Sequence, residues 1–118
     1  MESVTARHVD SGLAVKGYEI HHGQTNGINL PAVVVREDGV VVGVKYGDGL
    51  LWGTYLHGIF DADEFRRWFI DKLRVRRALP PLGKVVAAYD LEPAFDRLAN
   101  VVRSCLNINE IYRLMGLR

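Results

Sequence analysis

The sequence predicts a mixed fold in which strands and hairpins over residues 1–57 precede helices over residues 61–116. Two observations lead to this prediction. In the first half, short runs of β-branched and aromatic residues alternate with glycine-containing turns. After Asp61 the apolar period changes from two residues to about 3.6. Taken alone, strands followed by helices favour the α+β class.

The first two strands are expected to form a hairpin. Residues 3–9 are predicted to be a strand that alternates around Val4, Ala6 and Val9. Residues 10–12 give a turn signal, and residues 13–21 continue as a second strand. Because the first strand begins almost at residue 1, we expect the chain to start within a larger fold. An artificial boundary and a split gene would both produce such a start.

Further turn signals divide the rest of the first half. Residues 23–27 are polar and glycine-rich and are expected to form a loop. The valine run at residues 33–35 predicts a short strand. Asp38-Gly39 then gives a hairpin signal before a strand at residues 40–44. Residues 46–49 form another turn, which leads into the strand that ends at His57.

That segment, residues 51–65, is predicted to run from a strand through a tight turn into a helix. Its strand ends at His57, and Gly58 supplies the backbone freedom that a sharp turn requires. Asp61 is expected to be the helix N-cap, with Glu64 at the capping-box position. His57 therefore lies at the carboxyl end of a strand, where open α/β sheets place their chemistry. A histidine there can act as a general base.

Three helices are expected after the turn. The first carries one apolar stripe, made of Phe65, Trp68, Phe69 and Leu73. Pro80 and Pro81 end it, because proline cannot continue a helix. A second helix is expected from about Leu91, with Phe95, Leu98, Ala99, Val102 and Leu106 at helical spacing. Asn107 is expected to cap a short terminal helix, with Glu110 at the capping-box position and Gly116 near its end.

Composition excludes several classes of protein. The hydrophobic content of 48% suffices for a globular core, and a net charge of +1 provides no global field for nucleic acid or anionic membrane. The single cysteine, Cys105, excludes an internal disulfide and fits a reducing compartment. No apolar run approaches the length of a membrane span, and no signal peptide is evident. We therefore expect a cytoplasmic protein that binds neither membrane nor nucleic acid.

Two motifs carry a resemblance to a known family. Residues 53–61 read Gly-Thr-Tyr-Leu-His-Gly-Ile-Phe-Asp, and residues 17–25 read Gly-Tyr-Glu-Ile-His-His-Gly-Gln-Thr. In this order and at this separation, they resemble the glutamine amidotransferase domain of the cobyric acid synthase family. The resemblance covers essentially the whole chain. The related cobyrinic acid a,c-diamide synthases match the two motifs less closely.

The resemblance implies an α/β fold of the class I glutamine amidotransferase type, of which residues 1–118 would be the C-terminal portion. The segment with the nucleophile and the ATP-binding domain would lie upstream, outside this chain. The parent enzyme would use ATP and magnesium, whereas this chain needs no cofactor or metal. Its partners would be glutamine, a corrinoid substrate and the N-terminal remainder. An incomplete sheet would leave an apolar edge uncovered, so self-association is a further expectation.

By motif match, His57 would be the base for a cysteine nucleophile. The alternative interpretation is a histidine that closes a strand and is satisfied by backbone. Cys105 has no glycine turn around it and is expected to be a partly buried helical residue rather than the nucleophile. Many amidotransferases carry a glutamate two residues after this histidine, to orient it. Ile59 occupies that position here, as in the cobyric acid synthase branch, so the orienting group stays open. Asp61 and Asp63 fit the helix start instead.

The second motif provides the candidate substrate-binding residues, Glu19, His21, His22 and Tyr55. Glu19 and His21 should lie on one face of a strand and His22 on the other. They are expected either to form a wall of the glutamine site or to be a polar edge strand. A metal site made of His21 or His22 with His57 and Asp61 is not supported, because the spacing of these residues matches no zinc signature. The arginines and lysine of the first helix alternate with carboxylates and are expected to be a solvated face.

The resemblance implies ATP-dependent amidation of corrin-ring carboxylates in cobalamin biosynthesis, with this chain inactive by itself. One alternative is a non-catalytic module that binds a partner through its uncovered sheet. Another keeps the amidotransferase but changes its substrate, to the a,c-carboxylates of cobyrinic acid or to a cell-wall precursor. The sequence does not decide which carboxylates are amidated, nor the oligomeric state.

Overall fold

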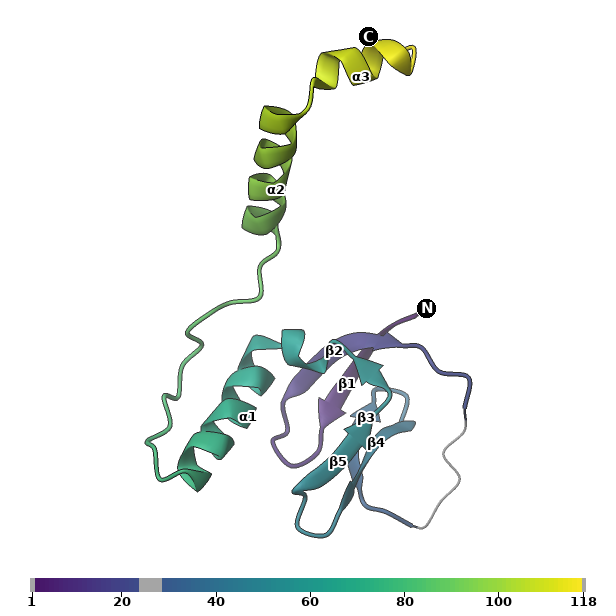
Figure 1. Ribbon diagram of the computed structural model, residues 1–118. Helices are drawn as coiled ribbons and strands as arrows, with labels where there is room; N and C mark the ends of the chain where they lie inside the picture. The colour runs from purple at the N-terminus through teal and green to yellow at the C-terminus, as the bar shows by residue number, and fades with distance from the viewer. Residues whose placement is uncertain (1, 24–28, 118) are drawn as a thin grey trace. The chain divides into compact units, whose positions relative to one another are not determined.

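A computed structural model describes residues 2–23 and 29–117 (Figure 1). The chain divides into two units, residues 1–88 and residues 89–118. The first unit contains all the strands and the helix α1 (Asp63–Arg76). The second contains α2 (Glu92–Cys105) and α3 (Ile108–Leu114). The predicted order of strands before helices is confirmed, and the chain is a mixed α/β segment.

The first unit is built on a six-stranded sheet in the order β5-β4-β3-β1-β2-β6. The strands are β1 (Glu2–His8), β2 (Ala14–Glu19), β3 (Ala32–Arg36), β4 (Val41–Tyr46), β5 (Leu51–Thr54) and β6 (Leu56–His57). All pairings between the described strands are antiparallel. The two predicted hairpins, β1–β2 and β3–β4, are confirmed, with Gly12 and Gly39 at positive φ in their turns. The loop predicted at residues 23–27 falls mostly on residues 24–28, which lie outside the described residues.

The strand predicted over residues 51–57 is divided at Tyr55 into two strands with different partners. β5 pairs with β4, whereas β6 pairs with β2 at the other end of the strand order. Residues on either side of Tyr55 are at most about 7 Å apart. The two ends of the sheet must therefore meet, and the sheet curves back on itself. The sequence had predicted one continuous strand here and gave no sign of this curvature.

Thr54 stabilises this change of partner through its hydroxyl group. The hydroxyl donates to the Val42 carbonyl at 2.7 Å and accepts the Leu56 N–H at 3.1 Å. The Tyr55 N–H also donates to the Val42 carbonyl, at 2.9 Å. The backbone groups released at the division are thus paired locally, which lets Leu56 and His57 turn toward β2.

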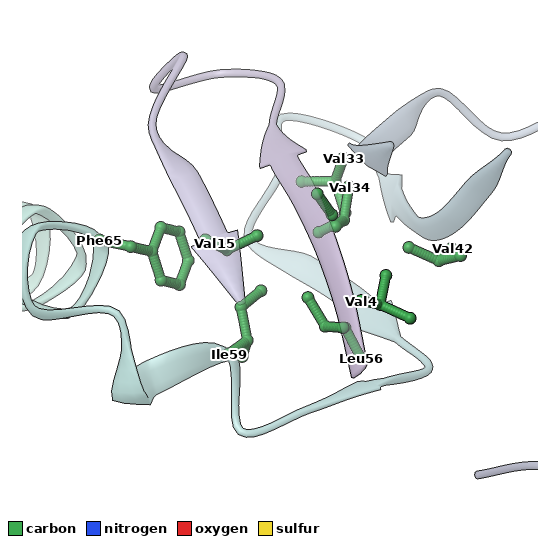
Figure 2. Packing of buried hydrophobic residues seen from close by; sticks show 9 residues of the cluster. Val4, Val15, Val33, Val34, Val42, Leu56, Ile59 and Phe65 are labelled. Atoms are coloured by element: carbon green, nitrogen blue, oxygen red, sulfur yellow. The ribbon is translucent and has the colours of Figure 1, made fainter. Parts of the chain in front are cut away.

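The core is enclosed by the curved sheet and α1 and consists mainly of small branched side chains. It is made of Val4, Ala6, Val15, Val33, Val34, Val42, Leu56, Ile59 and Phe65. Figure 2 shows Phe65 pointing from α1 toward Val15 of β2. Val33 and Val34 are both buried although they are consecutive, because register shifts in the β3–β4 pairing change the side-chain alternation there.

The alternation predicted for the first strand is wrong at its end. Val9 was expected to alternate inward with Val4 and Ala6, but it is 48% exposed and His8 is buried in its place. Residue 8 keeps the two-residue period of β1, whereas residue 9 lies beyond the strand. The apolar stripe predicted for the first helix lies on α1 as expected, with Phe65 buried in the core and Leu73 48% exposed.

The predicted capping box at Asp61 is also wrong. A 3₁₀ turn, η1 (Ile59–Asp61), separates the sheet from α1, and the N-cap position of α1 is Ala62, which makes no side-chain capping bond. Gly58, at φ +77°, begins this turn, and the Asp61 N–H donates to the Gly58 carbonyl at 2.8 Å. The turn therefore uses the residues that the prediction had assigned to the cap.

The second unit agrees more closely with the predicted helices. α2 begins one residue after the predicted start. The Asn107 side chain accepts the Glu110 N–H at 3.1 Å and caps α3, as predicted. Gly116, at φ +70°, follows the end of that helix. None of the described helices is long and apolar enough to cross a membrane.

Candidate functional site

The candidate catalytic residue, His57, lies at the exposed end of β6. Its neighbour Leu56 is buried in the core, so the alternation of the strand directs the His57 side chain to the outer face of the sheet. Tyr18 and Glu19 of β2 pair with His57 and Leu56, respectively. The carboxyl-terminal position predicted for His57 on a strand is therefore observed.

The pairing of β2 with β6 brings the two sequence motifs together. The Tyr18 and His57 rings stack, with centroids 5.4 Å apart and planes 7° from parallel. Gly17 makes this close approach possible, because a Cβ atom there would lie 2.0 Å from the His57 carbonyl oxygen. Tyr18 is not among the site residues predicted from the sequence. Only the strand register shows that this motif residue faces the histidine.

Glu19, His21 and Tyr55 form a second group of side chains. The His21 imidazole stacks on the Tyr55 ring at 4.0 Å and 14°. Its Nδ1 lies 2.8 Å from the Gly23 carbonyl, and its Nε2 lies 3.3 Å from Glu19 Oε1. Both partners, a carbonyl and a carboxylate, can act only as hydrogen-bond acceptors. The predicted strand over residues 13–21 ends at Glu19, so His21 and His22 lie beyond β2, and His21 reaches Glu19 from the segment after the strand.

This group is anchored to the β3–β4 turn through Arg36. Arg36 Nη1 donates to Glu19 Oε2 at 2.9 Å, and Nη2 donates to Asp38 Oδ2 at 2.5 Å. The Val40 backbone N–H and then Arg36 hold the pKa of Asp38 below its ordinary value. The Glu19 side chain is only 15% exposed. Its carboxylate is engaged by both His21 and Arg36.

His57 has few polar neighbours. Within the described part of the chain, its imidazole has the ring contact with Tyr18 and no hydrogen bond. His22, the fourth substrate-binding candidate, is exposed and is not joined to Glu19 or His21 by a hydrogen bond. Among the residues described, no group of three or more His, Cys, Asp or Glu side chains could hold a metal ion.

The basic residues of α1 are engaged with neighbouring groups. Arg66 pairs with Asp63 at 2.5 Å and Arg67 with Asp71 at 2.8 Å, while the Lys72 ammonium lies 4.6 Å from the centroid of Trp68. The charge on this helix is mixed, as predicted, but the side chains of Arg67 and Asp71 are each only 13% exposed, so this part of the face is not solvated. Cys105 ends α2 and is exposed, whereas the sequence analysis expected partial burial.

A second histidine that the sequence analysis did not single out, His8, is 2% exposed. Its ring packs against Phe65 and Trp68 at 4.9 and 4.8 Å, and its Nδ1 accepts the Ser11 N–H at 3.2 Å. Desolvation lowers its pKa below the ordinary value of 6.5. His8 lines a cavity of about 450 Å³ between the sheet and α1. The residues lining it do not include His57 or Glu19, so the cavity is separate from the candidate site.

Comparison with known proteins identifies the family. Residues 1–65, which include both motifs, match the family of CobB/CobQ-like glutamine amidotransferase domains. The chain belongs to this family. No solved structure matches it.

Several curated relatives of the CobB/CobQ-like domain are similar over nearly all of this chain. Cobyric acid synthase of Nitratidesulfovibrio vulgaris is 56% identical over 110 residues, which cover 90% of this chain and 20% of the relative. The adenosylcobalamin biosynthesis bifunctional protein CobDQ of Leptospira interrogans is 48% identical, over 99% of this chain and 14% of the relative. Cobyric acid synthase of Citrobacter koseri is 45% identical over 89% of this chain and 22% of the relative. The chain thus spans about a fifth or less of these proteins.

Proposed function

We propose that this chain carries the catalytic histidine of a cobyric acid synthase, and that the complete enzyme amidates corrin-ring carboxylates in cobalamin biosynthesis. Glutamine would be the nitrogen donor, and the amidation would depend on ATP. The domain would have the class I amidotransferase-like fold. The similarity to relatives named cobyric acid synthase supports the choice of this branch over cobyrinic acid a,c-diamide synthase or cell-wall amidation.

The observation that carries the proposal is the placement of His57. It lies at the end of a strand, on the outer face of the sheet, directly beside the Gly17–Glu19 motif. Both ring nitrogens lie on the edge of an imidazole that makes no hydrogen bond within the described residues. Such a ring can receive a proton from a nucleophile brought to it and return that proton to a leaving group.

In the proposed reaction, a cysteine thiol of the complete enzyme transfers its proton to His57 and attacks the side-chain amide carbon of glutamine. The C–N bond breaks, and His57 returns the proton to the departing nitrogen, which leaves as ammonia. Water then hydrolyses the thioester to release glutamate. Cys105 does not fit the nucleophile, because it ends a helix rather than a strained strand-to-helix turn.

Among the described residues, no group of side chains offers a site for ATP or magnesium. The described residues contain no candidate metal cluster, and the sequence has no glycine-rich loop followed by lysine to hold phosphates. We therefore assign both to the remainder of the enzyme, and no step by this chain passes through them.

A chimera tests the proposal directly. The matched segment of the Nitratidesulfovibrio vulgaris cobyric acid synthase would be replaced by this chain, and ammonia release from glutamine would be measured. We expect the chain alone to be inactive and the chimera to be active. His57→Ala in the chimera should lower kcat by roughly 10²- to 10⁴-fold, the usual contribution of a general base.

The control is Cys105→Ser in the same chimera, which should retain full activity. Activity of the chain alone that is lost in Cys105→Ser would overturn the assignment of both the nucleophile and the incomplete site. Full activity of the His57→Ala chimera would exclude His57 as the base. A folded but inactive chimera with native His57 would instead favour the non-catalytic interaction module.

A further inference from the structure

The sequence leaves open which group orients His57, and the described carboxylates nearby are not bonded to it. Ile59, which stands where many amidotransferases carry an orienting glutamate, is 5% exposed and belongs to the core. Asp63 pairs with Arg66 of its own helix, and Glu19 is engaged by His21 and Arg36. Asp61 makes no hydrogen bond to the imidazole, although its carboxylate oxygen would lie 2.9 Å from a Cβ placed on Gly58.

The group that does meet the imidazole is the phenol ring of Tyr18. Their strand positions are directly paired, and the two rings are almost parallel at 5.4 Å. Tyr18 itself is 40% exposed, on the face of β2 opposite to the buried Val15. Its side chain is therefore not needed to fill the core, and stacking on His57 is its one ring contact among the described residues.

Gly17 fixes the distance over which this contact can form. A side chain at residue 17 would meet both the His57 carbonyl, at 2.0 Å, and the Leu56 side chain, at 3.1 Å. Its absence lets β6 lie against β2, which places Tyr18 beside His57. Gly17 and Tyr18 are successive residues of the first motif. Gly17 contacts the backbone of His57, and Tyr18 contacts its ring.

We propose that Tyr18 positions the His57 imidazole for catalysis by covering one face of the ring. A stacked ring is restricted in its rotation, while its two nitrogens remain free at the edge for proton transfer. This role deepens the proposed function and depends on His57 being the base. Tyr18 is a positioning residue and takes no part in the chemistry itself.

Spectroscopy on the 118-residue chain tests the contact without any activity. In histidine-labelled protein, ring current from Tyr18 should move the His57 imidazole proton resonances upfield. Tyr18→Phe should retain the shift and Tyr18→Leu should abolish it. Tyr46→Leu is the matched control, because Tyr46 is an exposed tyrosine of β4 in the same sheet, and it should leave the His57 resonances unchanged.

Core amide resonances, such as those of Val15 and Val33, would show that each variant is folded. If Tyr18→Leu is folded and leaves the His57 resonances where they are in the native chain, Tyr18 does not stack on His57 in solution and the inference fails. If Tyr18→Leu does not fold, the Tyr18→Phe spectrum decides instead, since loss of the upfield shift in that folded variant would equally contradict stacking.

Kinetics in the chimera then separate this inference from the proposed function. We expect Tyr18→Leu to lower kcat by roughly 10- to 100-fold with little change in KM for glutamine, because the substrate still binds while the base is misplaced. Tyr18→Phe should restore most of the activity. An active chimera that is insensitive to Tyr18→Leu overturns the positioning role alone. An inactive native chimera overturns the proposed function, while the spectra still decide whether the rings stack.

Discussion

At the scale of single residues, the two most informative histidines differ in environment. His57 lies on the outer face of β6 with its ring edge free, whereas His8 is buried among Phe65, Trp68 and Trp52. The Nδ1 of His8 accepts the Ser11 N–H, which requires that nitrogen to be unprotonated. Burial and this hydrogen bond both favour the neutral imidazole. The fold therefore leaves one histidine exposed at a strand end and holds the other neutral within the apolar packing.

The lowered pKa of His8 makes the stability of the fold depend on pH. In the unfolded chain His8 should titrate near 6.5, while desolvation holds its pKa below that value in the native state. As the pH falls below about 6.5, the unfolded state binds a proton that the native state does not, so the free energy of unfolding decreases. The limiting slope for this single group is about 1.4 kcal/mol per pH unit.

Urea unfolding at about pH 7.5 and about pH 5.5 measures this dependence. His8→Leu removes the titrating group while keeping an apolar side chain, and we expect it to be less sensitive to acidification than the native chain. Equal sensitivity in the two proteins would show that His8 does not contribute to the acid response.

At the scale of elements, the turns were the most predictable feature and the helix start was the least. Gly12, Gly39, Gly47 and Gly49 all adopt positive φ, so glycine in a polar run located the turns between strands correctly. The start of α1 was misplaced because local capping signals do not reveal that a 3₁₀ turn uses the same residues. Both hairpins were predictable because each involves neighbouring strands.

The candidate site was predictable only in part, for a related reason. The motif identified His57 and Glu19 as important, but the stacking partner Tyr18 depends on the β2–β6 pairing, which joins residues far apart in the chain. Nothing in the local pattern of residues 51–57 indicates that the strand changes partner at Tyr55. The fold's curvature and the identity of the group facing His57 were therefore both inaccessible to local sequence patterns.

Because β6 packs closely on β2 at Gly17, we expect alanine substitutions at Gly17 and Gly53 to have different effects on stability. In Gly17→Ala the new Cβ would overlap the His57 carbonyl oxygen, so the strands must separate, and we expect a loss on the order of 1–3 kcal/mol in the free energy of unfolding. Gly53→Ala is the matched control. It lies in β5 with nothing within 4 Å of the position that its new methyl group would take, and should be neutral, or stabilising by about 0.5–1 kcal/mol. Chemical denaturation of both variants measures the difference, and equal stabilities would contradict the close approach.

At the scale of the whole molecule, the curvature of the sheet limits where the predicted uncovered apolar edge can lie. The two ends of the strand order are joined through Tyr55, so the described sheet curves back on itself. Exposed apolar side chains remain on β4 and β5, where Val41, Tyr46 and Leu51 are 51%, 66% and 67% exposed. Tyr46 and Leu51 are cross-strand partners, which makes them a continuous apolar surface.

Self-association therefore remains a prediction, now located at the β4–β5 end of the sheet. We expect the sedimentation coefficient of the chain to rise with concentration, and Leu51→Lys to reduce that rise by placing a charge on the edge strand. Lys16→Glu on β2 is the control, because Lys16 lies outside this apolar surface and its replacement adds no apolar side chain. A monomer at all concentrations would show that this surface does not support association.

Burial of Leu56, next to His57, determines which face of the sheet presents the imidazole. A slip of one residue in the β2–β6 pairing would exchange the two faces of the strand, bringing the imidazole into the apolar interior and leaving Leu56 in water. Both displacements are unfavourable, so the correct alignment is strongly preferred. Leu56, which has no reactive group, thereby selects the side of the sheet on which His57 is presented.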